Sequence, residues 1–373
     1  MISIDNYTKT IIKNNNITKY IKLSDKSIFY IKQFFELIQN SNTFSLIKHE
    51  IYDIIPSKIN LTSSLFIDER IIANIKQHIS IGYKYIFKIN DRTIHLNFFS
   101  SNYDKIYDEY YKLIHRWLNI ITKFSLSNCS KNLYIDIYLT DLKKKFNGKN
   151  ITPFNVNSGY TTGGCKETNK IVIYRRQEWF KVLIHETIHA FAIDFSYIND
   201  TLIDGNLKDI FPLNISLNSY EAYCEAWSVI WNSVFHSFNI EMYDFNLFIK
   251  QFRIIYTMEC IFSYQQMNTI LNHMNLDYIN LFSKDVESIK KRESYREDTN
   301  IISYFVLKTI LIQNINKFFT LCENNTNLML FNTHENNMLS FVNFFKKNYL
   351  HFPFKDNIQV NKKYIRFVLY DFN

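Results

Sequence analysis

The stretch KVLIHETIHAF, residues 181–191, combines two histidines and a glutamate at a spacing that can do chemistry. On a helix, His185 and His189 are one turn apart and project from the same face. Two neutral imidazoles on one face supply half of a tetrahedral zinc shell. Glu186, turned by about 100° from His185, flanks the place of a metal-bound water. The pattern therefore predicts two metal ligands and a general base.

The alternative is that both histidines are ordinary core residues. Thr187 and Ile188 between them are uncharged, and the flanks VLI and AFAI are apolar, so the helix is expected to be buried. Without a metal, such a helix would bury a carboxylate and two imidazoles uncompensated, at a cost of several kcal/mol. The sequence favours the metal site.

Alternation and helical periodicity predict the elements that position this stretch. Residues 83–100 alternate on both sides of Asn90-Asp91, which predicts a β-hairpin. A second hairpin is expected from residues 155–162 and 170–175, directly before a helix at 177–195. The remaining expectations are a strand at 132–140 and helices at 25–40, 102–124, 218–238, 242–274 and 300–319.

The segment KIVIY ends two or three residues before the HETIH helix. We therefore expect the strand at 170–175 to be an exposed edge beside the metal, where an extended peptide adds by backbone hydrogen bonds. The residues of this predicted substrate edge are Ile171, Val172, Ile173 and Tyr174.

Over roughly residues 102–275, the predicted sheet, the HExxH helix and a second helix with a downstream glutamate resemble the zincin superfamily of metallopeptidases. More narrowly they resemble gluzincins. The phrase NVNSGYTT…IVIYRRQEWFKVLIHETIHAFAIDFS is also similar to predicted metallopeptidases encoded by large eukaryotic DNA viruses.

The resemblance implies an α+β fold with a zincin-like mixed sheet and active-site helix. The catalytic domain would span 102–283, between an N-terminal α/β region (1–101) and a mostly helical C-terminal lobe (284–373). It also implies one Zn²⁺ per chain and an endopeptidase in which Glu186 serves as general base to a zinc-activated water.

Gluzincins take their third ligand from a glutamate on the second helix, and an acid four residues later accepts a hydrogen bond from a ligand histidine. In NSYEAYCEAWS this likeness implies that Glu221 coordinates and Glu225 orients, although the second acid is usually Asp. However, Asn218 to Glu221 also fits a capping box, which would leave Glu225 as the ligand. Metzincins are disfavoured because AFAIDFSYIND lacks their HxxGxxH continuation. Asp194 in this stretch lies near the expected helix end.

Zincins usually aim a Tyr, His or Arg donor at the oxyanion. We look for it first in SYREDTNIISY, where Tyr304 is the named candidate. The other candidates are Tyr295, Arg296, His236 and His273. With 26 tyrosines in the chain, a packing role is the alternative for each.

Composition limits the kinds of partner and the cellular compartment that we expect. The charge of +8 is dispersed among acids, which makes nucleic acid an unfavoured partner. The five cysteines are odd in number and form no CxxC, which argues for a reducing compartment and against a disulfide framework or a cysteine zinc site. Apolar stretches of about 12 residues are too short to span a bilayer, and MISIDNYTKTIIKNNN lacks a signal-peptide core.

We expect an intracellular, cytoplasmic protein, in the host cytoplasm or virion if viral, that acts on a protein or peptide without a membrane partner. Two other functions stay open: a zinc hydrolase that acts on another amide, and a structural or binding protein in which zinc only holds the fold together.

Overall fold

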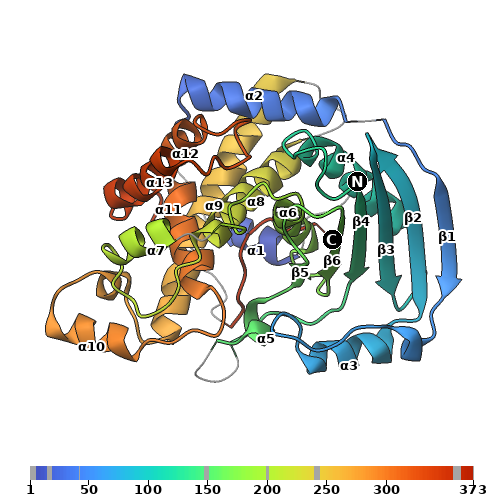
Figure 1. Ribbon diagram of the computed structural model, residues 1–373, viewed down its shortest axis with the longest axis horizontal. Coiled ribbons are helices and arrows are strands. Elements are labelled where there is room, and N and C mark those ends of the chain that lie inside the picture. The colour runs from blue at the N-terminus through green and yellow to red at the C-terminus, as the bar shows by residue number, and fades with distance from the viewer. Residues whose placement is uncertain are drawn as a thin grey trace.

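Alternating apolar residues build a six-stranded mixed sheet, and most helices gather on one side of it (Figure 1). The computed structural model describes residues 6–14, 19–41, 43–146, 151–198, 201–238, 244–355 and 363–372. The α+β class expected from the sequence is confirmed.

The strands follow one another across the sheet in the order β1 (Lys48–Asp53), β2 (Ile81–Ile89), β3 (Arg92–Ser100), β4 (Asn132–Tyr138), β6 (Thr168–Ile173) and β5 (Gly159–Thr161). Strands β1 to β3 are antiparallel, β3, β4 and β6 are parallel, and β5 runs antiparallel to β6. The β2–β3 hairpin turns at Asn90-Asp91 as predicted, and Asn90 adopts the left-handed φ of 53° that asparagine tolerates.

Strand β6 is not the edge of the sheet, so the prediction for residues 170–175 is wrong. Strand β4 pairs with one side of β6 and β5 with the other. The short strand β5 forms the edge instead. An apolar run such as Ile-Val-Ile suits a strand covered on both faces, but the hairpin pattern alone does not reveal which of its two strands joins the rest of the sheet. The predicted substrate residues are therefore interior: Ile171, Val172 and Ile173 lie within β6, and Tyr174 is buried just after it.

Helices cover both faces of the sheet at β6. Ile171 and Ile173 share a core cluster with α6 (Trp179–Ala190) and with α4 (Ile106–Ile121), the crossover from β3 to β4. Val172 points the other way, into a cluster with α3 (Glu69–His78). This alternation follows from the two-residue period of a strand.

Beyond α6 lies the helical part of the molecule, where α8 (Ser219–Ser237) packs between α6 and α9 (Phe245–His273) (Figure 1). The predicted helix at 242–274 is one continuous helix over its described residues, and Ser24 caps the predicted helix at 25–40. The expected helix at 300–319 is divided into a π-helical segment (Ile302–Leu307), α11 (Lys308–Gln313) and α12 (Ile315–Cys322). The remaining helices are α1 (Asn6–Asn14), α2 (Asp25–Gln39), α5 (Pro153–Val156), α7 (Thr201–Lys208), α10 (Val286–Ser294) and α13 (Glu335–Asn348), with 3₁₀ turns at Pro56–Lys58 and Tyr278–Leu281.

Residues 365–372 form a buried segment with bends at 367 and 369, which packs against the start of α6. Glu178 accepts hydrogen bonds from the backbone N–H groups of Phe367 and Val368, and Glu259 accepts those of Leu369 and Tyr370. Buried amides need such partners when no strand supplies them. The largest core cluster extends from Ile11 to Phe372. It includes residues from each of the three predicted parts of the chain, 1–101, 102–283 and 284–373.

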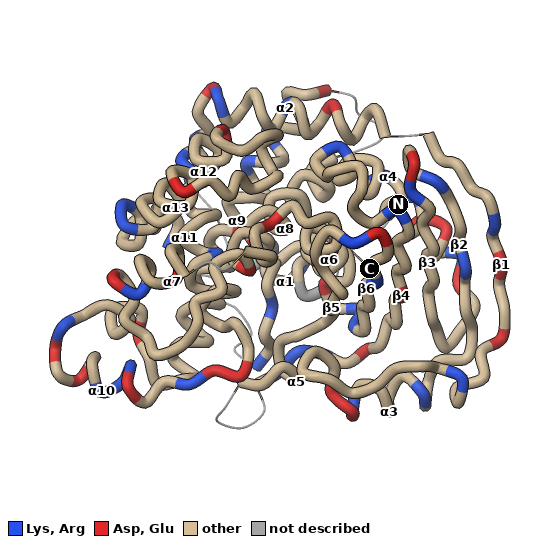
Figure 2. Tube along the Cα trace, in the orientation of Figure 1, with Lys and Arg blue, Asp and Glu red and all other residues tan. Residues whose placement is uncertain are grey.

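Lys and Arg are interspersed with Asp and Glu along the trace (Figure 2). Among the helices of the described residues, none combines the length and the apolar character needed to cross a bilayer.

Candidate metal centre

The helix α6 presents the HETIH stretch inside the protein. All twelve of its residues are buried, and His185 and His189 are 6% and 8% exposed. Their Nε2 atoms lie 3.1 Å apart. Ligand atoms at about 2.0–2.1 Å from a tetrahedral zinc ion are about 3.3 Å from one another. The two imidazoles therefore have the separation of two ligands of one ion.

Glu221 brings a third donor atom from α8. Its Oε2 lies 3.2 Å from Nε2 of His185 and 3.3 Å from Nε2 of His189. The three donors form a nearly equilateral triangle with the spacing of one face of a tetrahedral zinc shell, and all three residues line one cavity.

The electrostatics of the site favour positive charge. Burial lowers the pKa of His185, but Glu225 and Glu221 outweigh it and raise the pKa. Burial raises the pKa of the Glu221 carboxyl, but His189 and His185 hold it well below its usual range. A cation at the centre of the triangle would meet an ionised carboxylate and two nitrogen donors.

The capping box that competed for Glu221 is absent. The side chain of Asn218 makes no hydrogen bond to the start of α8 and donates instead to Oδ1 of Asn300. The Glu221 carboxylate is consequently free to face the histidines. Glu225, the alternative ligand, lies on the other side of the His185 ring, with Oε1 2.9 Å from Nδ1.

Each proposed ligand has a polar neighbour, buried or half-buried, on the atom that faces away from the triangle. Nδ1 of His189 lies 2.7 Å from Oδ2 of Asp194, and Oε1 of Glu221 accepts from Asn300. Glu225 occupies this place for His185 at hydrogen-bonding distance, although the N–H direction at Nδ1 misses the oxygen. Such partners fix the orientation of metal ligands.

Cys224 does not compete with the triangle. Its Sγ lies 3.7 Å from Nδ1 of His189, beside Asp194 and on the side away from Glu221. Burial raises the pKa of this thiol well above its ordinary value, so Cys224 stays protonated and packs as a small core residue.

Glu186 and Tyr304 line the same cavity as His185, His189 and Glu221. The volume of this cavity is about 260 Å³. Burial raises the pKa of Glu186 against the opposing effect of the two histidines. The ring of Tyr304 lies 6.3 Å from that of His185. Tyr304 belongs to the π-helical segment, a rare geometry that is frequent at functional sites. Burial also raises the pKa of the Tyr304 hydroxyl, which keeps it a hydrogen-bond donor.

The edge strand β5 forms one wall of this cavity. On either side of β5, the carbonyl of Ser158 accepts from the N–H of Tyr174, just after β6, and the N–H of Thr162 donates to the carbonyl of Lys170 in β6. Because antiparallel pairing alternates, the backbone groups of Gly159 and Thr161 point away from β6.

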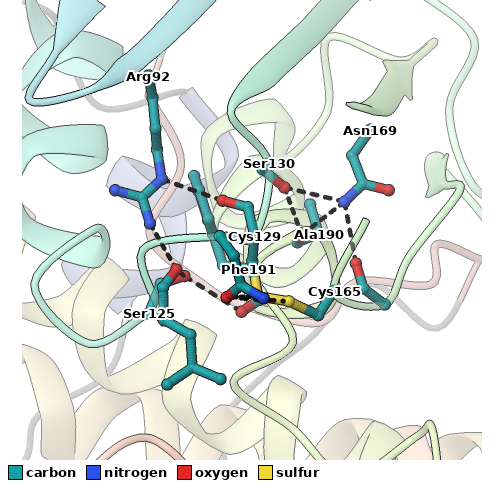
Figure 3. Close-up of a disulfide and its surroundings, with 11 residues drawn as sticks. Arg92, Ser125, Cys129, Ser130, Cys165, Asn169, Ala190 and Phe191 are labelled. Carbon is teal, nitrogen blue, oxygen red and sulfur yellow. Dashed lines mark hydrogen bonds between the residues drawn. A yellow bond between two sulfur atoms is a disulfide. The ribbon is translucent and has the colours of Figure 1, made fainter. Parts of the chain in front are cut away.

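One disulfide joins Cys129 to Cys165, which the odd number and scattered positions of the cysteines did not predict (Figure 3). The two residues are 36 positions apart, a spacing that carries no sequence pattern. The inference of a reducing compartment loses its basis. The other three cysteines, Cys224, Cys260 and Cys322, are free and buried.

The disulfide secures two loops at the carboxyl end of α6. Ser130 and Asn169, which stand near its two halves, both donate to the carbonyl of Ala190 (Figure 3). Gly164, next to Cys165, donates its backbone N–H to the carbonyl of His189. The loop after β5 is thereby held against the helix that carries the histidines.

The structure brings His185, His189 and Glu221 together and places Glu225 beside His185, whereas the contacts of Asp194 and Asn300 were not expected from the sequence. The position of Asp194, an acid shortly after the second histidine, could have suggested its contact with His189. No sequence pattern pointed to the contact between Asn300 and Glu221. Comparisons with protein-family models, with curated proteins and with solved structures find no match for this chain.

Proposed function

We propose that this protein is a zinc-dependent peptidase in which His185, His189 and Glu221 bind one Zn²⁺. The observation that supports it most is the triangle of donor atoms, 3.1 to 3.3 Å apart, at a cavity that Glu186 also lines. When bound, zinc lowers the pKa of a coordinated water to about 7 and polarises a carbonyl group.

Glu186 would act as the general base. Its buried carboxylate accepts a proton from the attacking water and then donates it to the leaving amine. The raised pKa of Glu186 suits the second half of this transfer, because the carboxyl holds the proton until the amine takes it. The hydroxyl of Tyr304 would donate to the carbonyl oxygen as negative charge develops on it.

The substrate would be an extended peptide bound along β5. The outward backbone groups of Gly159 and Thr161 offer the hydrogen bonds of an unpaired strand, and a peptide that pairs with them lies in the same cavity as Glu186. A site in which zinc only holds the fold together is less well supported, because such sites are closed by four protein ligands.

Metal analysis and peptide cleavage together test this proposal. Protein purified without chelator should contain about one zinc per chain, and the His185→Ala and His189→Ala variants should contain almost none. His115→Ala is the matched control, because His115 is also buried but lies on α4 away from the triangle. Zinc-loaded protein should cleave members of a peptide pool derived from a proteome. A folded wild-type chain without affinity for zinc would contradict the proposal.

A further inference from the structure

A lysine is buried beside the candidate centre. Lys181 precedes His185 by one turn on α6 and is only 2% exposed. Its Nζ donates to both carboxylate oxygens of Glu225 on α8. A buried ammonium is costly even when it is paired, so the position of Lys181 calls for a reason beyond stability.

The same carboxylate reaches the proposed metal ligand. Oε1 of Glu225 lies 2.9 Å from Nδ1 of His185, and the opposite ring atom, Nε2, lies 3.2 Å from Glu221. The order of contacts is thus Lys181, Glu225, His185 and then the donor triangle. Lys181 and His185 share one face of α6, and Glu225 on α8 contacts both of them.

The glutamate at position 225 explains what the lysine contributes. The glutamate side chain is long and flexible, so its carboxylate can take many orientations unless other groups hold it. Lys181 bonds to both oxygens at once and lies 4.4 Å from the ring centre of Phe367, which bounds the ammonium on another side. The carboxylate plane is thereby fixed.

We propose that Lys181 is a positioning residue that fixes Glu225 and, through the close contact of that carboxylate with Nδ1, the ring orientation of His185. The inference rests on the proposed zinc function. It concerns the geometry of the ligand rather than any contact of Lys181 with substrate.

Two other buried lysines provide matched comparisons. Lys144 and Lys308 are completely buried, and both lie close enough to Lys181 for its charge to lower their pKa. Lys144 pairs with Glu178, and Lys308 donates to the hydroxyl of Ser263 and the carbonyl of Phe367. Each should matter for folding, but neither donates to the carboxylate that contacts His185.

The test compares full-length Lys181→Met with Lys308→Met. The zinc Kd is measured by competition with a chromophoric chelator, and the visible spectrum of the Co²⁺ form reports ligand geometry. Lys181→Met should weaken zinc binding by about 10-fold, the lower end of the effect of partners of metal ligands, and should change the Co²⁺ spectrum. Lys308→Met should lower the unfolding temperature and leave the Co²⁺ spectrum at its wild-type form, because Lys308 acts on Glu225 through its charge but donates its hydrogen bonds elsewhere.

A double variant separates positioning from general destabilisation. In a Glu225→Gln background, Lys181→Met should change the zinc Kd no further, because the two residues act in series. If methionine prevents folding, Lys181→Arg against Lys308→Arg gives the same contrast, since a guanidinium cannot reproduce the contacts of an ammonium in this space.

Equal Co²⁺ spectra for the Lys181 and Lys308 variants, or full additivity with Glu225→Gln, would overturn this inference alone. A folded wild-type protein that binds no zinc would instead overturn the proposed function, and the role of Lys181 with it.

Discussion

Glu221 and Glu225 lie one turn apart on α8 and approach opposite nitrogens of the same imidazole. Oε2 of Glu221 is 3.2 Å from Nε2 of His185, and Oε1 of Glu225 is 2.9 Å from Nδ1. A histidine that binds a metal through one nitrogen donates the hydrogen on the other, so the two glutamates have different roles in the proposed centre.

The first prediction separates these roles. Glu221→Ala should abolish tight zinc binding because it removes a proposed donor atom. Glu225→Ala should raise the zinc Kd by roughly 10–100-fold, as the loss of a hydrogen-bonding partner does. Chelator competition on both variants at matched protein concentration measures the difference. The reverse order of effects would exchange the two assignments.

Glu186→Gln tests the general base. Glutamine keeps the shape of the side chain but cannot accept the proton of the water, so turnover should fall by at least about 10²–10⁴-fold while zinc content stays unchanged. The assay is cleavage of a proteomic peptide pool, with metal content measured on the same samples. Equal cleavage by the two proteins at equal zinc occupancy would rule out this mechanism.

Tyr304→Phe removes the proposed donor to the carbonyl oxygen. We expect kcat to fall by about 10²–10³-fold, the usual effect of losing one such donor, with little change in zinc Kd. Tyr295→Phe is the control: Tyr295 is also buried and close in sequence, but its hydroxyl bonds to Glu297. Similar kinetics for the two variants would leave Tyr304 with a packing role only.

Glu259 predicts a pH dependence of stability. Burial raises the pKa of Glu259 to about 7, even though the backbone amides of Leu369 and Tyr370 bond to the carboxylate. Because the folded pKa exceeds the unfolded value of 4.5, the contribution to stability is complete below about pH 4.5 and is lost as the pH rises through about 7. The loss is up to roughly 3 kcal/mol.

Urea denaturation from about pH 5 to about pH 8 measures this contribution. The unfolding free energy of wild type relative to Glu259→Gln should decrease across the interval, because glutamine does not titrate. Parallel curves for the two proteins would show that the carboxyl titrates alike in the folded and unfolded states.

Reduction of the Cys129–Cys165 disulfide should lower stability. In the chain-entropy account a loop of this length contributes roughly 3–4 kcal/mol. Wild type should lose this amount in urea denaturation when dithiothreitol is added, whereas Cys165→Ser should be insensitive to the reductant. A wild-type curve that the reductant does not move would contradict the prediction.

Local patterns were sufficient for much of this molecule. The spacing in HETIH placed His185 and His189 on one helical face, and alternation around Asn90-Asp91 located the β2–β3 hairpin. These features depend on residues within one or two turns of each other, where periodicity and turn chemistry act directly.

The remaining features depend on contacts between distant residues. Asn300 is 79 positions from Glu221, and Lys181 is 44 from Glu225, so no local pattern joins them. The edge position of β5 likewise depends on which hairpin strand meets β4. The π-helical turn at Tyr304 looks in sequence like any apolar helix.

The buried segment at residues 365–372 has a consequence for the timing of synthesis. Glu178, just before α6, takes a left-handed φ of 61° and accepts the amide of Phe367, which is 189 positions later in the chain. At about 5–20 residues per second, a ribosome needs roughly 10–40 s to cover that distance. During this interval the first turn of α6 lacks its support from the later residues. His185 and His189 are therefore synthesised well before the residues that support the start of their helix. The candidate centre can be completed only after residues 365–372 have been made.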